Sequence, residues 1–298
     1  MAQYHTGTAG WSYRDWEGMV YPRKKPPGFH ALQFLSNYID FMEINSTFYR
    51  MPVFNFAQSW TQKVKKNPHF LFAVKLHQDF THKERNPTQN QADEFKFGIE
   101  PLRANGRLGA ILIQFPWSFS HSSQNKDYLD ILFTLFSGLP LALEVRHSSW
   151  DQPDFLKFLR DHRVAFCNID QPIFRSSIKP TAYATNPGFS YVRLHGRNYK
   201  NWFRKNAGRD QRYDYLYSDE ELQDWIHRIQ ELGDKSKKTF VVTNNHYRGQ
   251  ALTNAIQIKY KLTNEKMDVP EQLLQNFPEL KKIIKEISKG QIDLFEKG

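Results

Sequence analysis

The feature that most limits the fold of this chain is a regular alternation of short apolar runs with amphipathic helical patterns. The apolar runs, which predict strands, lie at residues 4–8, 41–45, 70–76, 108–115, 141–145, 164–170, 191–195 and 240–244. Most are apolar at both odd and even positions, as expected of strands covered on both faces. Helical patterns lie at residues 29–39, 56–66, 91–106, 127–138, 153–163, 218–233 and 250–262. This alternation predicts a single (β/α)8 barrel of the TIM type.

No linker rich in Pro, Gly or Ser divides the chain, so we predict one barrel domain at residues 1–262. Residues 263–298 are charged and amphipathic, which predicts a short C-terminal helical extension packed on the barrel. A doubly wound open sheet is the alternative fold. Such a sheet usually carries a Gly-rich phosphate turn after its first strand, and "GTAGWSY" at residues 7–13 does not match G-x-G-x-x-G.

Helix ends carry recognisable signals at four places. Ser218 followed by Glu221 is the pattern of a capping box at a helix start. Gly106, Gly138 and Gly233 stand where the C-caps of three predicted helices are expected, because glycine adopts the left-handed backbone conformation that often ends a helix.

Charge and cysteine content restrict the class of protein. The chain has 41 Lys and Arg against 31 Asp and Glu, a formal net charge of +10, which favours anionic partners. Its one cysteine, Cys167, lies in the apolar run "VAFCNID", so neither an intramolecular disulfide nor a thiolate metal cluster is expected. The N-terminus lacks a signal-peptide pattern, and no stretch approaches about 18 consecutive apolar residues. We therefore expect a cytoplasmic protein that does not associate with membranes.

Polar side chains follow most of the predicted strands. In a TIM barrel the carboxyl ends of the strands converge on one face, where catalytic groups are normally found. The set comprises Glu43, Asn45, Lys75, Gln114, Glu144, Arg146, His147, Asn168, Asp170, Arg193, His195, Asn244 and Asn245. Charges inside a barrel are costly unless paired. Buried ion pairs, Glu144 with Arg193 or Glu43 with Lys75, are one explanation; for the whole set we favour a polar pocket.

Seven stretches of the chain form a recognisable set: "GTAGWSYRDWEGMVYP" (7–22), "FMEINSTFYRMP" (41–52), "FLFAVKLHQDFTH" (70–82), "LGAILIQFPWSF" (108–119), "LEVRHSSW" (143–150), "YVRLHGR" (191–197) and "NNHYRGQALTNA" (244–255). In the order and spacing of these stretches the chain resembles the YecE-like family, also called domain of unknown function 72. The resemblance implies a TIM-type barrel and no established reaction. By position, the family's recurring polar set falls on Trp11, Ser12, Tyr13, Glu43, Asn45, Tyr49, Lys75, His82, Gln114, Glu144, Arg146, His147, Asp170, Arg193, His195, Arg197 and Asn245.

These residues suggest acid–base chemistry on an anion. We expect Glu43, between apolar neighbours, to be desolvated and protonated, and Glu144, near Arg146, to stay ionised. His195 is expected to transfer protons near neutral pH. The predicted catalytic residues are Glu43, Glu144, Asp170 and His195. The predicted substrate-binding residues are Trp11, Tyr13, Asn45, Tyr49, Lys75, His82, Gln114, Arg146, His147, Arg193, Arg197 and Asn245, in which Arg and Lys would hold phosphate or carboxylate oxygens.

A metal site is the weaker alternative. The motifs H-E-x-x-H and H-x-H are absent, although Glu43, Glu144, Asp170, His147 and His195 could still assemble a site from separate strands. Because the surrounding set is strongly cationic, we predict no metal and no other cofactor, and keep a divalent metal as the alternative.

The loop at residues 196–218 combines six cations with six aromatic residues. Such a loop suits a lid over a phosphorylated substrate or a surface that binds single strands, and a solvated loop that packs its rings on the barrel is the third possibility. We predict an enzyme, a hydrolase, lyase or isomerase, that acts on an anionic sugar-containing substrate, either a phosphorylated sugar or a nucleic-acid strand. A non-catalytic protein that binds single-stranded nucleic acid is the alternative.

Overall fold

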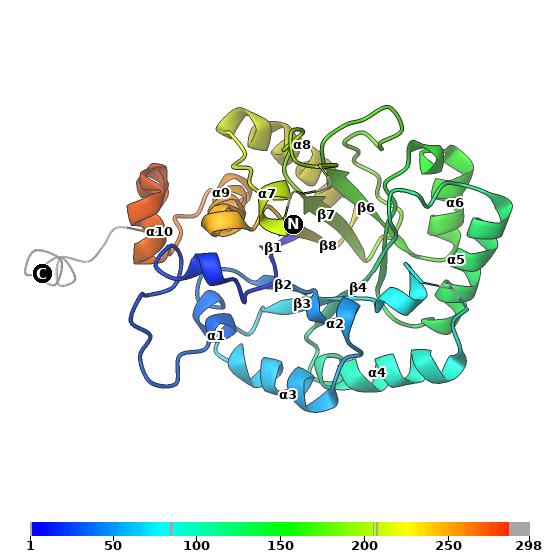
Figure 1. Ribbon diagram of the computed structural model, residues 1–298, viewed down its shortest axis with the longest axis horizontal. Helices are drawn as coiled ribbons and strands as arrows, with labels where there is room; N and C mark the ends of the chain where they lie inside the picture. The colour runs from blue at the N-terminus through cyan, green and yellow to red at the C-terminus, as the bar shows by residue number, and fades with distance from the viewer. Residues whose placement is uncertain (1, 84–85, 205, 207, 286–298) are drawn as a thin grey trace, which may run out of the picture.

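The computed structural model describes residues 2–83, 86–204, 206 and 208–285. Eight parallel strands pair in chain order, and the first also pairs with the last, which closes the barrel (Figure 1). The strands are β1 (Gln3–Ala9), β2 (Phe41–Ile44), β3 (Leu71–Lys75), β4 (Leu108–Gln114), β5 (Leu141–Glu144), β6 (Ala165–Asp170), β7 (Phe189–Leu194) and β8 (Lys238–Thr243). The predicted TIM-type fold is therefore confirmed, and each strand coincides with a predicted run to within a few residues.

Helices surround the strands (Figure 1). They are α1 (Ala31–Leu35), α2 (Ser46–Tyr49), α3 (Phe54–Lys63), α4 (Gln89–Ala104), α5 (Ser123–Leu135), α6 (Pro153–Asp161), α7 (Arg209–Arg212), α8 (Asp219–Lys235), α9 (Gln250–Thr263) and α10 (Glu271–Asn276). Two short helices, α2 and α7, carry no helical periodicity in the sequence and were not predicted. Residues 171–188, all of them described, connect β6 to β7 without a helix.

Helix-end signals were right in three of the four places. Ser218 and Glu221 form both hydrogen bonds of a capping box at the start of α8. Gly106 and Gly138 follow α4 and α5 with φ of +64° and +80°, which a side chain rarely adopts. Gly233 is instead inside α8, and the prediction of a C-cap there was wrong. A Cβ at this position would lie 2.5 Å from the Tyr4 hydroxyl, so the glycine allows helix and strand to approach.

Strand parity decides which side chains enter the barrel. Each of β3 to β6 contributes an alanine to the interior, beside Leu71, Leu112 and Ile169, whereas β2, β7 and β8 contribute large rings that pack against one another. The small residues are Ala73, Ala110, Ala142 and Ala165, and the rings are Phe41, Phe189, Tyr191 and Phe240. The next residue of the same parity towards the carboxyl end is often polar. The alternation that fills the core therefore also points a ring of polar side chains into the mouth.

The chain beyond α9 packs against the barrel as far as it is described. Leu273 in α10, with Phe277 and Leu280 after it, is buried or nearly so and belongs to the same apolar cluster as the outer side of several strands. Residues 286–298 of the predicted extension lie outside the described residues. Among the helices that the structure describes, none combines the length and apolar character needed to cross a membrane.

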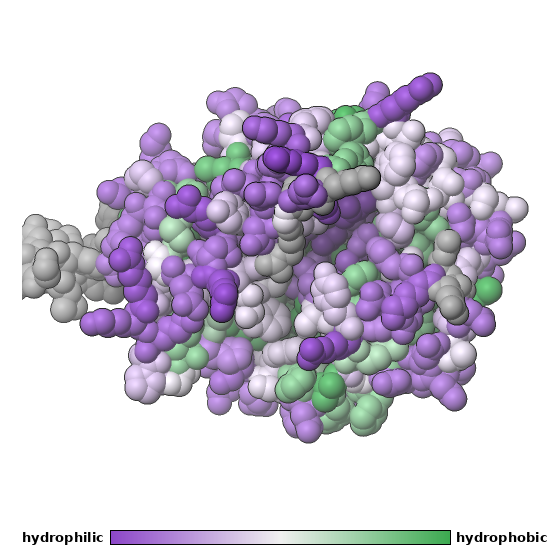
Figure 2. Space-filling view, in the orientation of Figure 1, coloured by the Kyte–Doolittle hydropathy of each residue, from purple (hydrophilic) through white to green (hydrophobic). Residues whose placement is uncertain are grey.

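Figure 2 shows one face of the molecule, which is largely hydrophilic and carries several separate hydrophobic patches. One of these patches lies over α3 and α4, where Phe56 and Phe97 are 62% and 64% exposed.

Candidate functional site

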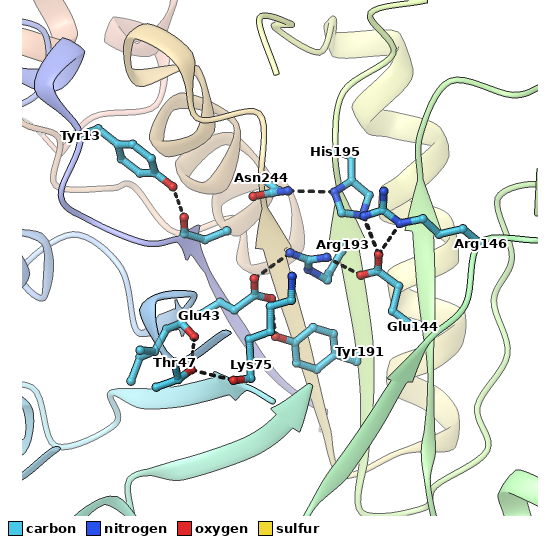
Figure 3. A network of polar contacts seen from close by, with 12 residues as sticks. Tyr13, Glu43, Thr47, Lys75, Glu144, Arg146, Tyr191, Arg193, His195 and Asn244 are labelled. Carbon is cyan, nitrogen blue, oxygen red and sulfur yellow. Dashed lines mark hydrogen bonds and ion pairs between the residues drawn. The ribbon is translucent and has the colours of Figure 1, made fainter. Parts of the chain in front are cut away.

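A layer of buried charges closes the interior of the barrel below its mouth (Figure 3). Arg193 at the end of β7 donates from Nη2 to Glu43 Oε1, at 2.7 Å, and from Nη1 to Glu144 Oε2. The Tyr191 hydroxyl donates to the second oxygen of Glu43, at 3.0 Å. All four side chains are buried. The predicted pair of Glu144 with Arg193 is present, and Arg193, rather than Lys75, is the partner of Glu43.

This pairing fixes the charge state of Glu144. Burial by itself would raise the pKa of Glu144, but Arg193, Arg146 and His195 outweigh it and hold that pKa well below its usual value. Burial also disfavours the charged form of Arg193, yet Glu144 and Glu43 raise its pKa well above the ordinary value. Glu144 is therefore ionised, as predicted. We expected apolar neighbours alone around Glu43, but both of its oxygens accept hydrogen bonds, from Tyr191 and Arg193.

Arg146 and His195 lie above Glu144. Arg146 donates from Nε to Glu144 Oε1 at 2.8 Å, and its Nη2 forms an ion pair with the same oxygen at 2.8 Å. His195 Nε2 lies 3.4 Å from the same oxygen, and the Asn244 amide nitrogen lies 2.9 Å from Nδ1. An amide that donates to Nδ1 leaves the ring proton on Nε2, directed at Glu144.

His195 does not titrate near neutral pH, so that expectation was wrong. Burial is the largest cause and lowers the pKa of His195 to about 3, with Arg193 and Arg146 acting in the same direction against the attraction of Glu144. The ring is therefore neutral at physiological pH, and the carboxylate below it has no proton to exchange.

A cavity of about 160 Å³ lies above this layer at the carboxyl ends of the strands. Its walls are formed by Tyr13, Asn45, Phe48, Tyr49, Lys75, Gln114, Arg146, Arg193, Tyr213, Asn244 and His246. Three of these residues are cations, and no carboxylate is among the described residues that line it. A larger hollow, of about 830 Å³, lies beside the N-terminal ends of β2 and β3 and is remote from this chemistry.

Lys75 is the cation whose environment is most unusual. Its Nζ lies 3.9 Å from the centre of the Phe48 ring, and no hydrogen bond or ion pair to Nζ is found among the described residues. Burial, followed by Arg193, lowers the pKa of Lys75 to about 7, although Glu144 and Glu43 oppose the shift. At neutral pH a large part of the Lys75 population is therefore an uncharged amine.

The end of β3 is held by the short helix α2. The Thr47 hydroxyl lies 2.7 Å from the carbonyl oxygen of Lys75 and 3.1 Å from that of Ile44. This hydroxyl ties the start of α2 to the ends of β2 and β3, and the next residue, Phe48, lies over the ammonium. His82 packs edge-on against Phe48, with ring centres 4.8 Å apart.

Aromatic rings from three segments form the rim. Tyr13 is stacked on His246, with ring centres 4.4 Å apart, and Tyr213 lies 5.3 Å from His246. Trp202 lies 5.9 Å from Tyr213, and the Arg146 guanidinium lies 6.0 Å from the Trp202 ring. Part of the loop at residues 196–218 thus reaches over the mouth.

Two buried polar atoms of the lining residues have no hydrogen-bond partner in the described part of the chain. They are Oδ1 of Asn45, an acceptor, and Nε of Arg193, a donor. Buried polar atoms are normally paired, so this arrangement suits a ligand that can both donate and accept.

The structure does not bring Asp170, Arg197 or Asn245 into the pocket. Asp170 and Asn245 have the outward parity of β6 and β8. Arg197 Nε donates to Asp170 at 2.9 Å, and its Nη1 donates to Glu221 in α8 at 3.0 Å. Asn245 donates to the carbonyl oxygen of Tyr215 at 2.7 Å. These groups fasten the loop and α8 to the barrel.

Two further predicted binding residues lie away from the cavity. His147 accepts from the backbone nitrogen of Ser149 at 3.2 Å and begins a short 3-10 turn. Trp11 packs edge-on against Trp60, with ring centres 5.8 Å apart. The other predicted binding residues, Tyr13, Asn45, Tyr49, Lys75, Gln114, Arg146 and Arg193, line the cavity, and His82 lies beside it.

Sequence reasoning missed several lining residues. It placed both Asn244 and Asn245 at the end of the last strand but chose only Asn245 as a binding residue. Val242 faces the interior and Asn244 shares its parity, so the parity of β8 could have selected Asn244. Phe48 and His246 carried no signal, because short helical turns outside the predicted elements place them at the cavity.

No three donors of the His, Cys, Asp or Glu type come together to form a metal-binding group among the described residues. Of the carboxylates that we considered as ligands, Glu43 and Glu144 accept from Arg193, and Asp170 accepts from Arg197.

Comparison with known proteins gives consistent matches along the chain. The model of the family described as "Protein of unknown function DUF72" matches residues 5–279. The UPF0759 protein YunF of Bacillus subtilis (strain 168) is 31% identical over 268 residues, which cover 85% of this chain and 93% of YunF. The crystal structure of a DUF72 family protein from Thermotoga maritima has 37% identity and a TM-score of 0.76, and covers 87% of this chain and 99% of its own. A DUF72 family protein from Enterococcus faecalis V583, at 24% identity and a TM-score of 0.77, shares the fold over 90% of this chain and 98% of its own.

Proposed function

The chain belongs to the DUF72 family of TIM-type barrel proteins, and from this premise we propose that it is an enzyme that binds a small anionic substrate in the barrel mouth and transforms it by acid–base chemistry. One observation carries the proposal. The cavity at the carboxyl ends of the strands is lined by Lys75, Arg146 and Arg193, and its described lining contains no carboxylate. The carboxylate partners of the two arginines lie beneath the cavity, so the guanidinium groups present N–H donors and positive charge to an anion at the mouth.

The carboxylates have a supporting role in this proposal. Glu43 and Glu144 are fully buried beneath the cavity, and their oxygens are taken up by Arg193, Arg146 and Tyr191. They hold the two guanidinium groups in fixed positions, which reduces the conformational freedom lost when an anion binds. We therefore move the catalytic role that the sequence suggested for the carboxylates to another group.

That group is Lys75. A general base works best when its pKa lies near the working pH, and the pKa of Lys75 is lowered to about 7. With the anionic end of a substrate on Arg146, the neutral amine is placed to take a proton from a neighbouring carbon or hydroxyl group. Proton abstraction of this kind favours a lyase or an isomerase over a hydrolase.

Cavity size restricts the substrate. A volume of about 160 Å³ is well below the roughly 300–1,000 Å³ of sites for drug-sized ligands. The amides of Asn45, Gln114 and Asn244 suit hydroxyl and carbonyl groups. A short phosphorylated or carboxylated compound, such as a small sugar phosphate or hydroxy acid, fits these features better than a nucleotide does.

Calorimetric titration with inorganic phosphate tests the anion site. We expect saturable binding, and Arg146→Met should weaken it roughly 10- to 150-fold, because a hydrogen bond to a charged group contributes about 1.5–3 kcal/mol. Arg103→Met is the matched control, since Arg103 pairs with Glu100 on the exposed surface of α4. Equal affinity in the two variants, or no binding to the unmodified protein, would contradict the proposal.

Single-strand binding is the alternative function, and the loop at residues 196–218 gives it one supporting feature. Tyr199 and Phe203 are 52% and 56% exposed, which leaves two rings on which bases could stack. The Tyr217 hydroxyl instead accepts from the backbone of Gly196, and Trp202 lies above the mouth. Retention of single-stranded oligonucleotides at about 50 mM salt would support this alternative, and no retention would exclude it.

A further inference from the structure

We infer that Lys75 is a nucleophile that forms an imine with the carbonyl carbon of its substrate, a small aldehyde or ketone that also carries a carboxylate or phosphate group. This inference rests on the anion site proposed above. It replaces direct proton abstraction by Lys75 with a covalent step, because a nitrogen bound in an imine is no longer a free base. It also names a substrate class, because an imine needs a carbonyl group in the substrate.

Geometry supports a nucleophilic amine at this position. Lys75 ends β3 and lines the cavity, and Figure 3 shows its side chain directed towards the charged network with no polar contact at its nitrogen. A structural lysine would be expected to pair with a carboxylate. The two nearest candidates, Glu43 and Glu144, are bound instead by Arg193. The charged layer therefore leaves Lys75 without a counter-ion in the described structure.

The neighbours of the amine favour attack on a carbonyl carbon. A lysine attacks only as the neutral amine, and desolvation together with nearby cations is the usual way to obtain that form at neutral pH. Burial and the charge of Arg193 have this effect on the pKa of Lys75. Arg146 and Arg193 also line the cavity, so an anionic group bound there would hold an adjacent carbonyl group near Nζ.

The covalent step needs no oxidant or reductant. The lone pair of Nζ forms a bond to the carbonyl carbon while the C=O π electrons move to oxygen, and a proton passes from nitrogen to oxygen through water to give a carbinolamine. The nitrogen lone pair then expels the hydroxyl group, which leaves as water after it takes up a proton. The resulting protonated imine carries a positive charge, and the buried carboxylates Glu43 and Glu144 attract that charge. A C–H bond next to the imine can then break: its electrons are drawn towards nitrogen and its proton passes to water.

Reductive trapping with glyoxylate and sodium borohydride tests the imine. Borohydride converts a glyoxylate imine into a stable carboxymethyl group, which intact mass and peptide mapping can locate. We expect Lys75 to be modified ahead of the other lysines, at a rate that rises through an apparent pKa near 7 rather than 10.5. Inorganic phosphate should compete with the reaction.

Two variants sharpen this test. Lys75→Met should lose the adduct. Lys259→Met should retain it, since Lys259 is also partly buried but forms an ion pair with Asp40 at 2.7 Å. If phosphate binds in an Arg146-dependent manner and Lys75 is modified no faster than other lysines, the imine is wrong and the anion site stands. If phosphate neither binds nor competes, the proposed function fails as well.

Discussion

Two neighbouring layers of the barrel mouth differ in whether their ionisable groups have partners of opposite charge. In the lower layer Arg193 lies between Glu43 and Glu144, and each charge is neutralised by a partner. In the upper layer Lys75 has an aromatic ring beside it and no carboxylate partner among the described residues. Paired buried charges contribute mainly to a defined structure, whereas an unpaired ionisable group in a cavity lowers stability and is typical of functional sites. We therefore expect the two layers to respond to substitution with opposite signs.

The largest effect is expected for Arg193→Met. Removing the guanidinium leaves two buried carboxylates without their shared partner, and breaking a buried pair in this way costs about 3–5 kcal/mol. Urea denaturation should show this as a fall in the free energy of unfolding. Arg103→Met, on the surface of α4, should change that free energy by less than about 1 kcal/mol.

A triple variant distinguishes the effect of charge pairing from the effect of side-chain packing in the lower layer. Glu43→Gln, Glu144→Gln and Arg193→Met together remove all three charges and should recover part of the lost free energy, because no buried carboxylate is left unpaired. Arg146 also loses its partner Glu144 in this variant, so the recovery should be incomplete. If the triple variant is as unstable as Arg193→Met, the shape of the arginine matters more than its charge, and the comparison between the layers is wrong.

Lys75→Met should stabilise the protein at pH 7, by about 2–4 kcal/mol. The folded-state pKa is about 7 and the ordinary value is 10.5, so between these values the unfolded chain holds a proton that the folded chain lacks. The free energy of unfolding therefore falls as the pH is lowered from 10.5 to 7, and Lys75 causes no further fall below pH 7. Because part of the side chain faces solvent, the expected gain is smaller than the free energy that the whole pKa shift would correspond to.

The pH dependence of the difference between Lys75→Met and the unmodified protein is the measurement. Thermal or urea unfolding should show a gain that is small near pH 10 and reaches its maximum near pH 7. Lys259→Met should instead destabilise, since it removes a lysine paired with Asp40. If Lys75→Met instead lowers the free energy of unfolding, Lys75 stabilises the fold, as the charges of the lower layer do.

Sequence alone predicted the barrel because the evidence for it is repeated eight times. Each strand is an apolar run, and an error at one boundary does not change the count or the order. The site is different, because one residue of register moves a side chain from the mouth to the outer face. Asp170 and Asn245 were assigned to the mouth because they stand at strand ends, while parity turns both outward.

The protonation state of a site residue was harder to predict from the sequence than its position in the barrel. Nothing in the run "FMEIN" shows that Glu43 receives a hydrogen bond from Arg193, which lies 150 positions further along the chain. The shifted pKa values of His195 and Lys75 likewise depend on charges brought together from β2, β5 and β7. Such shifts arise from burial and from the arrangement of neighbours, and neither is local in the sequence.

The smallest predicted effect distinguishes the mouth from the outer surface of the same loop. Trp202 lies 6.0 Å from the Arg146 guanidinium, while Phe203, the next residue, is 56% exposed and packs against Phe174. If the loop is a lid over an anion site, Trp202→Ala should weaken phosphate binding roughly two- to fivefold, the size of a partly exposed cation–π contact, and Phe203→Ala should not change it. If the loop binds single strands, Phe203→Ala should cost about 1–3 kcal/mol on an oligonucleotide, because a base stacks on the exposed ring, with little change in the salt dependence. Titrating both ligands with both variants therefore decides which side of the loop is functional. If only Phe203→Ala has an effect, and only on oligonucleotide binding, the functional site is the outer surface of the loop and not the cavity.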